Sequence, residues 1–196
     1  MGQEGLAADK KNARRLNAHL VFLDESGLLL APLVRRTWAP RGQTPVFYQR
    51  GRHREKVSII AVISISPRRH RIGLYFSLAS YLNVDAEWMV LFLRNLLRHL
   101  RGNVILIWDN LNVHKATAVK SFLRRHPRLH SEYLPAYAPE LNPVEAVWSH
   151  MKLNPLANYA PSDADVLAQA ALRHVSQLHR QPTLLRSFIH KTGLSL

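Results

Sequence analysis

Residues 104–110, VILIWDN, decide how the rest of the chain is interpreted. Five apolar residues in succession are too few for a helix and are typical of a strand that is buried on both faces. The run stops at Asp109 and Asn110, residue types that favour the turn after a strand. The stretch therefore predicts a central strand with an acidic residue at its end.

The residues before this strand predict two paired strands and a helix. Residues 57–66 (VSIIAVISIS) and 71–78 (RIGLYFSL) are rich in β-branched and aromatic residues around a PRRH turn, so they should pair antiparallel. Residues 83–100 place large apolar side chains at four-residue spacing, which is typical of a helix. Further upstream, residues 19–23 (HLVFL) predict a strand that ends at Asp24.

The residues after the central strand predict helices around one more strand. Residues 113–125 favour a helix, and residues 131–134 favour a brief strand before a proline-rich segment. Asn142 and Pro143 then form a helix start, with Asn as cap and Pro at the first position, and Glu145 is the third residue of that helix. Further helices are expected at residues 163–178 and 182–190.

The order of these elements predicts the fold class. Three strands come first and helices then alternate with strands, as in the RNase H-like fold, an α/β fold with a mixed five-stranded sheet flanked by helices. Residues 1–18 are expected to be a linker or an N-terminal helix, and residues 19–196 a single domain. If the first and fourth strands are neighbours, Asp24 and Asp109 emerge at one edge of the sheet, with Glu145 above them.

Three carboxylates at one edge of a sheet would suit phosphodiester chemistry. Two divalent cations can activate the attacking oxygen and stabilise the leaving oxygen of an in-line displacement, and Mg²⁺ prefers carboxylate oxygens and water as ligands. Without a cation, converging like charges raise one another's pKa, so such a cluster is not expected to serve stability alone. Asp24, Asp109 and Glu145 are therefore candidate catalytic and metal-binding residues.

Each acid also has a structural explanation. Asp24 and Asp109 could be ordinary turn residues after strands. Glu145 could complete a capping box by accepting a hydrogen bond from the amide of Asn142. Asn110 could orient Asp109 or only complete its turn. For each acid taken singly, the structural explanation stays open. The chain has only 13 acidic residues, and the arrangement of these three favours the catalytic explanation.

The charge of the chain indicates a polyanionic partner. Lys and Arg number 27 against 13 Asp and Glu, a formal net charge of +14, which would attract nucleic acid and release its counterions. Ribosomal and membrane-surface roles stay open on charge alone. The chain has no cysteine, which excludes disulfides and thiolate zinc sites and suits a reducing cytoplasm. No apolar run approaches the roughly 20 residues of a membrane span.

Two groups of basic residues are candidate DNA contacts. Segment 28–56 is rich in proline, glycine and arginine and predicts an irregular basic hairpin, whose candidate contacts are Arg50, Arg52, Arg54 and Lys56. Its aromatic residues Trp38, Phe47 and Tyr48 could stack on bases or belong to the core. His114 and Lys115 follow Asp109 at the start of a helix, where a phosphate would lie, although His114 could equally be a capping or solvent-facing residue.

Four stretches of the sequence resemble the signature blocks of a known family. They are VFLDESG (21–27), RRTWAPRGQTP (35–45), IWDNLNVHK (107–115) and YLPAYAPELNPVEAVWSHMK (133–152). In this order they are similar to the DDE transposases of bacterial insertion sequences, in the mariner-like superfamily. The 36 positions from Asp109 to Glu145 make a gap of the size that the family uses between its second and third acids.

The resemblance implies an RNase H-like catalytic domain whose triad is Asp24, Asp109 and Glu145, with Asn110 and Asn142 as supporting residues. It also implies two Mg²⁺ ions, for which Mn²⁺ can substitute. Family members cut DNA at transposon ends and join the freed 3′ hydroxyl to target DNA. Such an enzyme is expected to act as a homodimer in the synaptic complex, in the cytoplasm at the nucleoid.

The sequence departs from the family in two respects. Family transposases carry an N-terminal helix-turn-helix region that recognises the transposon ends, and the about 20 residues before the first strand cannot hold one. The chain is therefore expected to be part of a split or truncated transposase, with a separate helix-turn-helix polypeptide as partner. Ala146 follows the glutamate where many relatives have a bulkier polar residue, a change expected to matter little.

Two other classes of protein stay open. A junction resolvase or repair endonuclease of the same fold would share the acids and the charge but lack the WDN and ELNPVEAVW blocks. A non-catalytic DNA-binding relic of a transposase would keep the fold and lose the chemistry. The intact triad and the matching blocks favour the transposase.

Overall fold

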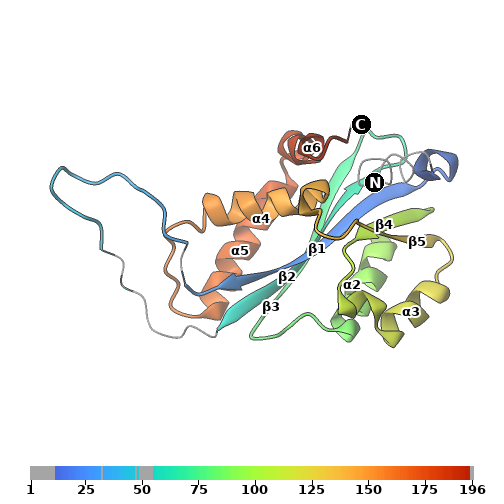
Figure 1. Cartoon of the computed structure of the whole chain (residues 1–196), viewed down its shortest axis with the longest axis horizontal. Coiled ribbons are helices and arrows are strands. Elements are labelled where there is room, and N and C mark those ends of the chain that lie inside the picture. Colours follow the sequence, from blue (N-terminus) through green and yellow to red (C-terminus); the bar gives the residue numbers. More distant parts are fainter. Residues whose placement is uncertain (1–11, 32, 47, 49–54, 195–196) are drawn as a thin grey trace.

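The computed structural model describes residues 12–31, 33–46, 48 and 55–194 of the chain. Three strands come first, and helices then alternate with strands (Figure 1). The strands are β1 (His19–Leu29), β2 (Lys56–Ile65), β3 (Ile72–Ser80), β4 (Val104–Trp108) and β5 (Leu129–Tyr133). The helices are α2 (Ala86–His99), α3 (Thr117–Arg124), α4 (Pro143–Leu153), α5 (Ala164–His179) and α6 (Pro182–Lys191), with short 3-10 helices η1 (Asn112–Lys115) and η2 (Pro139–Leu141).

The five strands form one mixed sheet in the order β3-β2-β1-β4-β5. β2 pairs antiparallel with β1 and β3, whereas β4 pairs parallel with β1 and β5. The predicted mixed five-stranded sheet is confirmed. The first and fourth strands are neighbours, so the condition that brings Asp24 and Asp109 to one edge is met.

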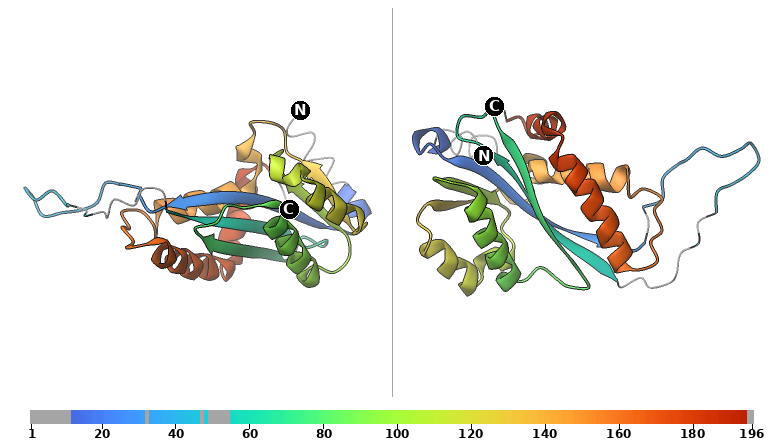
Figure 2. Two further views of the ribbon diagram at one scale, coloured as in Figure 1. Left: turned by 90° about the horizontal axis from the view of Figure 1, so that it is seen from below. Right: turned by 180° about the vertical axis from the view of Figure 1, so that it is seen from behind.

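The central strand β1 contributes side chains to two hydrophobic cores. Leu20 and Phe22 pack with residues of α4, α5 and α6, whereas Val21 and Leu23 pack with residues of α2 and α3. This division follows from the alternation of side chains along a strand. The two groups of helices accordingly lie on opposite sides of the sheet (Figures 1 and 2).

The first strand is longer than predicted. β1 continues to Leu29 because it pairs with β2 as far as that residue, so the prediction that Asp24 ends the strand is wrong. The parallel pairing with β4, however, stops at Phe22 opposite Ile107. Asp24 therefore lies two residues past the last residue of β1 that pairs with β4. This position is near the C-terminal end of β4, which Asp109 follows.

The helix predicted for residues 113–125 is interrupted. η1 ends at Lys115 and α3 begins at Thr117; Ala116 between them has an extended backbone (φ −59°, ψ 146°). Because η1 is a separate turn, His114 points into the protein and is buried, while the adjacent Lys115 is exposed.

Within the segment between β1 and β2, the described residues 33–46 are irregular, as predicted, and extend away from the helices and strands (Figure 1). Its base is fixed to the connection between α4 and α5: the Asn158 side chain accepts a 2.7 Å hydrogen bond from the Arg35 amide and donates one of 3.1 Å to the Arg35 carbonyl. Trp38 and Tyr48 are exposed, so the alternative that they belong to the core is wrong. Four residues of this prediction lie outside the described part: Phe47, Arg50, Arg52 and Arg54.

The N-terminal residues are described from residue 12 onward. Residues 12–15 form a helical turn with Ala13 buried against the sheet core. Across the described ranges, no helix is both long enough and apolar enough to cross a membrane.

Candidate active site

Acidic side chains from three elements line one pocket of about 480 Å³. Asp24 comes from β1, Asp109 follows β4, and Glu145 lies in the first turn of α4. The connection from β5 to α4, residues 134–139, supplies much of the remaining wall, together with Asn110 and Asn142. The structure thus brings together the three acids and both supporting asparagines that the sequence singled out.

Asp24 is the most buried of the three acids, with 8% of its surface exposed. Its Oδ2 accepts a 2.6 Å hydrogen bond from Nε1 of Trp148, a buried residue of α4. Burial raises the pKa of Asp24 to about 7; the bond from Trp148 opposes this change, and the charges of Glu145, Glu25 and Asp109 add to it. The neighbouring carboxylates act on Asp24 because they converge on it, so the pocket holds an excess of negative charge.

Asp109 serves as a turn residue and also faces the pocket. Its Oδ1 accepts a 3.1 Å hydrogen bond from the Leu111 amide and lies 3.1 Å from Nδ1 of His114. Its side chain is nevertheless 41% exposed. The turn explanation and the active-site explanation are therefore compatible, because one oxygen makes the turn and the other is left without a hydrogen bond among the described residues.

Glu145 does not complete a capping box. The Asn142 amide donates to the carbonyl of Pro139 at 2.9 Å, and Oδ1 of Asn142 accepts from the Val144 amide at 3.1 Å. Asn142 alone therefore caps α4. The carboxylate of Glu145 is left to line the pocket.

Three hydrogen bonds attach α4 to β1. Asn142 donates from Nδ2 to the carbonyl of Leu23 at 3.1 Å, Trp148 donates to Asp24, and Lys152 donates from Nζ to Oγ of Ser26 at 3.0 Å. The three donors follow one another along the helix in the same order as their acceptors follow one another along the strand. These contacts fix the axial position of α4, and Glu145 lies between the first two donors.

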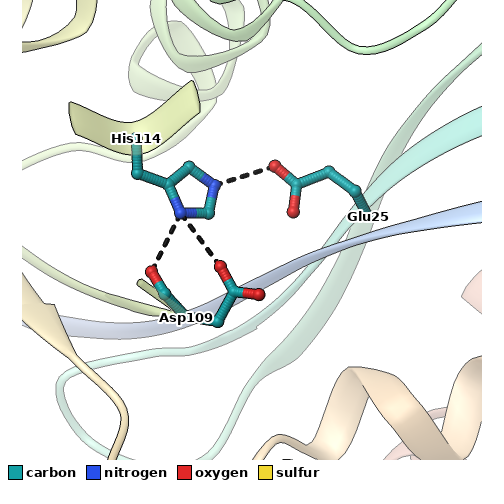
Figure 3. A group of neighbouring side chains, drawn as sticks. All are labelled: Glu25, Asp109 and His114. Carbon is teal, nitrogen blue, oxygen red and sulfur yellow. Dashed lines mark hydrogen bonds and ion pairs between the residues drawn. The ribbon is translucent and has the colours of Figure 1, made fainter. Parts of the chain in front are cut away.

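Glu25 and His114 form a second group of ionisable side chains beside Asp109 (Figure 3). The His114 side chain is fully buried, with Nε2 2.8 Å from Oε1 of Glu25 and Nδ1 2.9 Å from the backbone carbonyl of Asp109. Burial alone would lower the pKa of His114, but its hydrogen bonds to Asp109 and Glu25 outweigh this and raise it to about 9. At neutral pH the ring is therefore a cation between two carboxylates.

Within the described residues, Glu25, Asp109 and His114 are the three potential metal ligands whose donor atoms all lie within 4.8 Å of one another. Asp24 and Glu145 do not belong to that group; they line the same pocket as Asp109. The sequence analysis singled out His114 and Asp109 but not Glu25.

The basic residues predicted to contact DNA are placed differently from one another. Lys115 is exposed and is the last residue of η1, whose N-cap Leu111 lines the pocket. His114 has both ring nitrogens against protein atoms, which does not favour contact with a phosphate. Lys56 begins β2, five residues before the Ala61 that pairs with Asp24.

Two polar partners of the acids escaped the sequence analysis, Glu25 and Trp148. Each had a local signal. Glu25 directly follows Asp24 in a strand and so faces the other side of the sheet, toward η1. Trp148 is three positions after Glu145 and so lies on the same face of the helix.

The sequence matches the model of a family described as DDE superfamily endonuclease over residues 19–167 of 196. The chain belongs to this family. All three pocket acids fall inside the matched range. No curated protein sequence matches the chain.

The solved structures similar to this chain include several of the Mos1 transposase. A paired-end complex with the left transposon end is 20% identical with a TM-score of 0.64, over 96% of this chain and 57% of that one. A paired-end complex with Mg gives 18% identity and a TM-score of 0.59, over 98% and 61%. The Mos1 catalytic domain is 18% identical with a TM-score of 0.50, over 98% of this chain and 91% of that one. The likeness confirms the RNase H-like fold, and the chain spans about three fifths of the length of the first two.

The cap of α4 can be tested separately from the carboxylates. Asn142→Ala removes the hydrogen bonds to Val144 and Leu23, so we expect a loss of about 1–2 kcal/mol in the free energy of unfolding and a further loss of activity, since Glu145 is displaced. Asp85→Ala, which removes the cap of α2 far from the pocket, is the matched control. Equal activity of the two variants per folded molecule, measured beside urea unfolding, would contradict the role of Asn142 in placing Glu145.

The raised pKa of Asp24 predicts a pH dependence of stability in EDTA. Because the folded state holds this proton more tightly than the unfolded state, stability is lost as pH rises from 3.8 to about 7, by at most about 4 kcal/mol. Asp24→Asn keeps an acceptor for Trp148 and carries no charge, so its free energy of unfolding should overtake that of the wild type across this range. Parallel curves for the two proteins in urea unfolding would show that burial does not disfavour the Asp24 charge.

Proposed function

We propose that this DDE endonuclease is the catalytic domain of a transposase, which cleaves DNA strands at transposon ends and joins them to target DNA. The observation that carries the proposal is the convergence of Asp24, Asp109 and Glu145 in one pocket within an RNase H-like domain. We assign these three residues the catalytic and metal-binding roles.

The residues of the pocket fit divalent cations. Their donors are carboxylate oxygens, the ligands that Mg²⁺ and Mn²⁺ prefer. Burial is the main cause of the raised pKa of Asp24, and the neighbouring carboxylates add to it; a cation would relieve both the burial of this charge and the repulsion. Solved Mos1 complexes similar to this chain are described with Mg and with Mn. We propose two such ions for this site.

When bound, the cations would activate the attacking oxygen, first of water and then of a DNA 3′ hydroxyl, and neutralise charge on the phosphate. Asp24 and Asp109 bind from neighbouring parallel strands, which fixes their separation. Glu145 approaches from α4, and Trp148 orients the Asp24 carboxylate by occupying Oδ2. The chain's contribution is thus a rigid set of three carboxylates on two strands and one helix.

The surroundings of the pocket suit a DNA strand. The net charge of +14 favours association with a polyanion. Lys115 is exposed at the end of η1, whose N-cap Leu111 lines the pocket, and would contact a phosphate. Tyr137, which lines the pocket and is fully exposed, offers a ring on which a base can stack. Arg50, Arg52, Arg54 and Lys56 are further candidate contacts.

Transposition also needs recognition and pairing of the transposon ends. A solved Mos1 structure similar to this chain is a paired-end complex with the left transposon end. We propose that a helix-turn-helix region on a separate polypeptide of the same insertion sequence recognises the transposon ends, and that two catalytic domains act together in the synaptic complex, at the nucleoid of a bacterial cytoplasm.

Conservative variants of the triad test the assignment. Asp24→Asn, Asp109→Asn and Glu145→Gln should each lower the rate of DNA cleavage and joining by at least about 10³-fold, because an amide cannot replace a carboxylate at the cations. The assay is cleavage of duplex DNA carrying the element's ends in Mg²⁺ or Mn²⁺, with the helix-turn-helix partner added. Glu140→Gln, an exposed acid of η2 outside this pocket, should cleave as the wild type does.

The outcomes separate the classes of protein considered above. Products that are nicked but never joined to target would indicate another RNase H-like endonuclease. A wild-type protein that binds DNA and cleaves no better than Asp109→Asn would indicate a non-catalytic relic.

Lys115 can be tested through the salt dependence of DNA binding. Each phosphate contact contributes about one unit to the slope of log affinity against log salt, so Lys115→Ala should reduce that slope by about 1. Fluorescence anisotropy with a duplex at several salt concentrations measures the slope. Lys120→Ala, an exposed lysine of α3, is the control, and an equal effect of both variants would show that Lys115 makes no localised contact.

A further inference from the structure

Glu25 and His114 lie next to the proposed catalytic acids, yet neither belongs to the triad. Glu25 follows Asp24 in β1 and therefore faces the opposite side of the sheet, where η1 packs. Its side chain is 9% exposed, and its Oε2 is buried and has no hydrogen-bond partner in the part of the chain that the structure describes. The bond to His114 is thus the contact that compensates the burial of this carboxylate.

The ring of His114 is fixed in position and orientation. It stacks on Trp108 with 4.1 Å between ring centroids and 12° between planes, and Nε1 of Trp108 donates to Oγ of Ser131 at 3.0 Å. Nδ1 faces both the backbone carbonyl of Asp109 at 2.9 Å and its Oδ1 at 3.1 Å. Both atoms are acceptors, so Nδ1 carries a hydrogen.

These contacts connect the two strands that carry the aspartates. The β1–β4 pairing ends at Phe22 and Ile107, two residues before Asp24 and Asp109 respectively. Past that point, the bonds from Glu25 to His114 and from His114 to Asp109 join β1 to the residue after β4 (Figure 3).

Resting on the function proposed above, we propose that Glu25 and His114 form a positioning pair. His114 holds Oδ1 of Asp109, Glu25 holds His114, and the second oxygen of Asp109 stays available to the pocket. The pair acts through Asp109 and does not itself touch cation or DNA.

The geometry separates this role from metal binding by His114, although Glu25, Asp109 and His114 offer donor atoms within 4.8 Å of one another. Nδ1 carries a hydrogen and so has no lone pair for a cation. Nε2 faces Glu25, and the side chain is fully buried, so water and substrate phosphate could not complete a coordination shell there. Mg²⁺ also prefers oxygen to imidazole nitrogen.

Two amide substitutions test the two bonds separately. In His114→Asn the amide nitrogen lies near the place of Nδ1 and can still donate to Asp109; in His114→Gln it lies near the place of Nε2 and can donate only to Glu25. We expect His114→Gln to weaken Mn²⁺ binding, measured by calorimetry without DNA, by about 10–100-fold, with a parallel rise in the Mn²⁺ needed for cleavage. His114→Asn should stay within a few-fold of the wild type.

The control is His126→Ala, which removes a histidine in a similar setting away from the acids. Nδ1 of His126 faces the Phe122 carbonyl at 2.8 Å, and its ring stacks on Phe122 at 4.0 Å. This variant should bind Mn²⁺ as the wild type does, and thermal unfolding corrects all variants for their folded fraction.

The outcomes distinguish this inference from the proposed function. The positioning pair is overturned if His114→Gln binds Mn²⁺ as tightly as the wild type does, or more tightly than His114→Asn does. This holds even where the wild type cleaves DNA. The latter result would make Nε2 a ligand. If His114→Gln is the only variant that binds Mn²⁺ weakly, the positioning pair is supported. If the wild type in that case does not cleave DNA, the proposed function is contradicted.

Discussion

The site depends on the position of α4 along β1. Packing of apolar side chains such as Val144, Val147 and Met151 holds the helix on the sheet, but such contacts are not directional. The hydrogen bonds from Asn142, Trp148 and Lys152 to β1 set the register. A shift of one residue along the helix would turn Glu145 by about 100° and move it by about 1.5 Å, enough to remove it from the pocket.

This arrangement concentrates negative charge in a protein that is otherwise strongly basic. Burial raises the pKa of Asp24, and the charges of Glu145, Glu25 and Asp109 raise it further, so the ionised carboxylate is unfavourable here without a counter-charge. His114 supplies one positive charge from within the protein, on the side of the sheet opposite α4. The remaining imbalance lies in the pocket itself, where cations and the DNA backbone would meet.

The sequence was informative where local pattern decides structure. The five apolar residues of β4 and the Asn142–Pro143 start of α4 lie where predicted, because burial on both faces and helix capping are readable over a few residues. The predicted end of β1 was wrong because the length of this strand is set by pairing with β2: residues 25–29 pair with residues that lie 27 to 35 positions further along the chain. The bonds from Trp148 to Asp24 and from His114 to Glu25 likewise depend on tertiary contacts between residues far apart in the chain.

Anomalous scattering from crystals grown with Mn²⁺ tests the central claim most directly, because it locates the cations without any assumption about activity. The account predicts anomalous peaks within coordination distance of carboxylate oxygens of Asp24, Asp109 and Glu145, with His114 still bonded to Asp109. Peaks coordinated by Nε2 of His114 and by Glu25, or no peak in the pocket at saturating Mn²⁺, would contradict it.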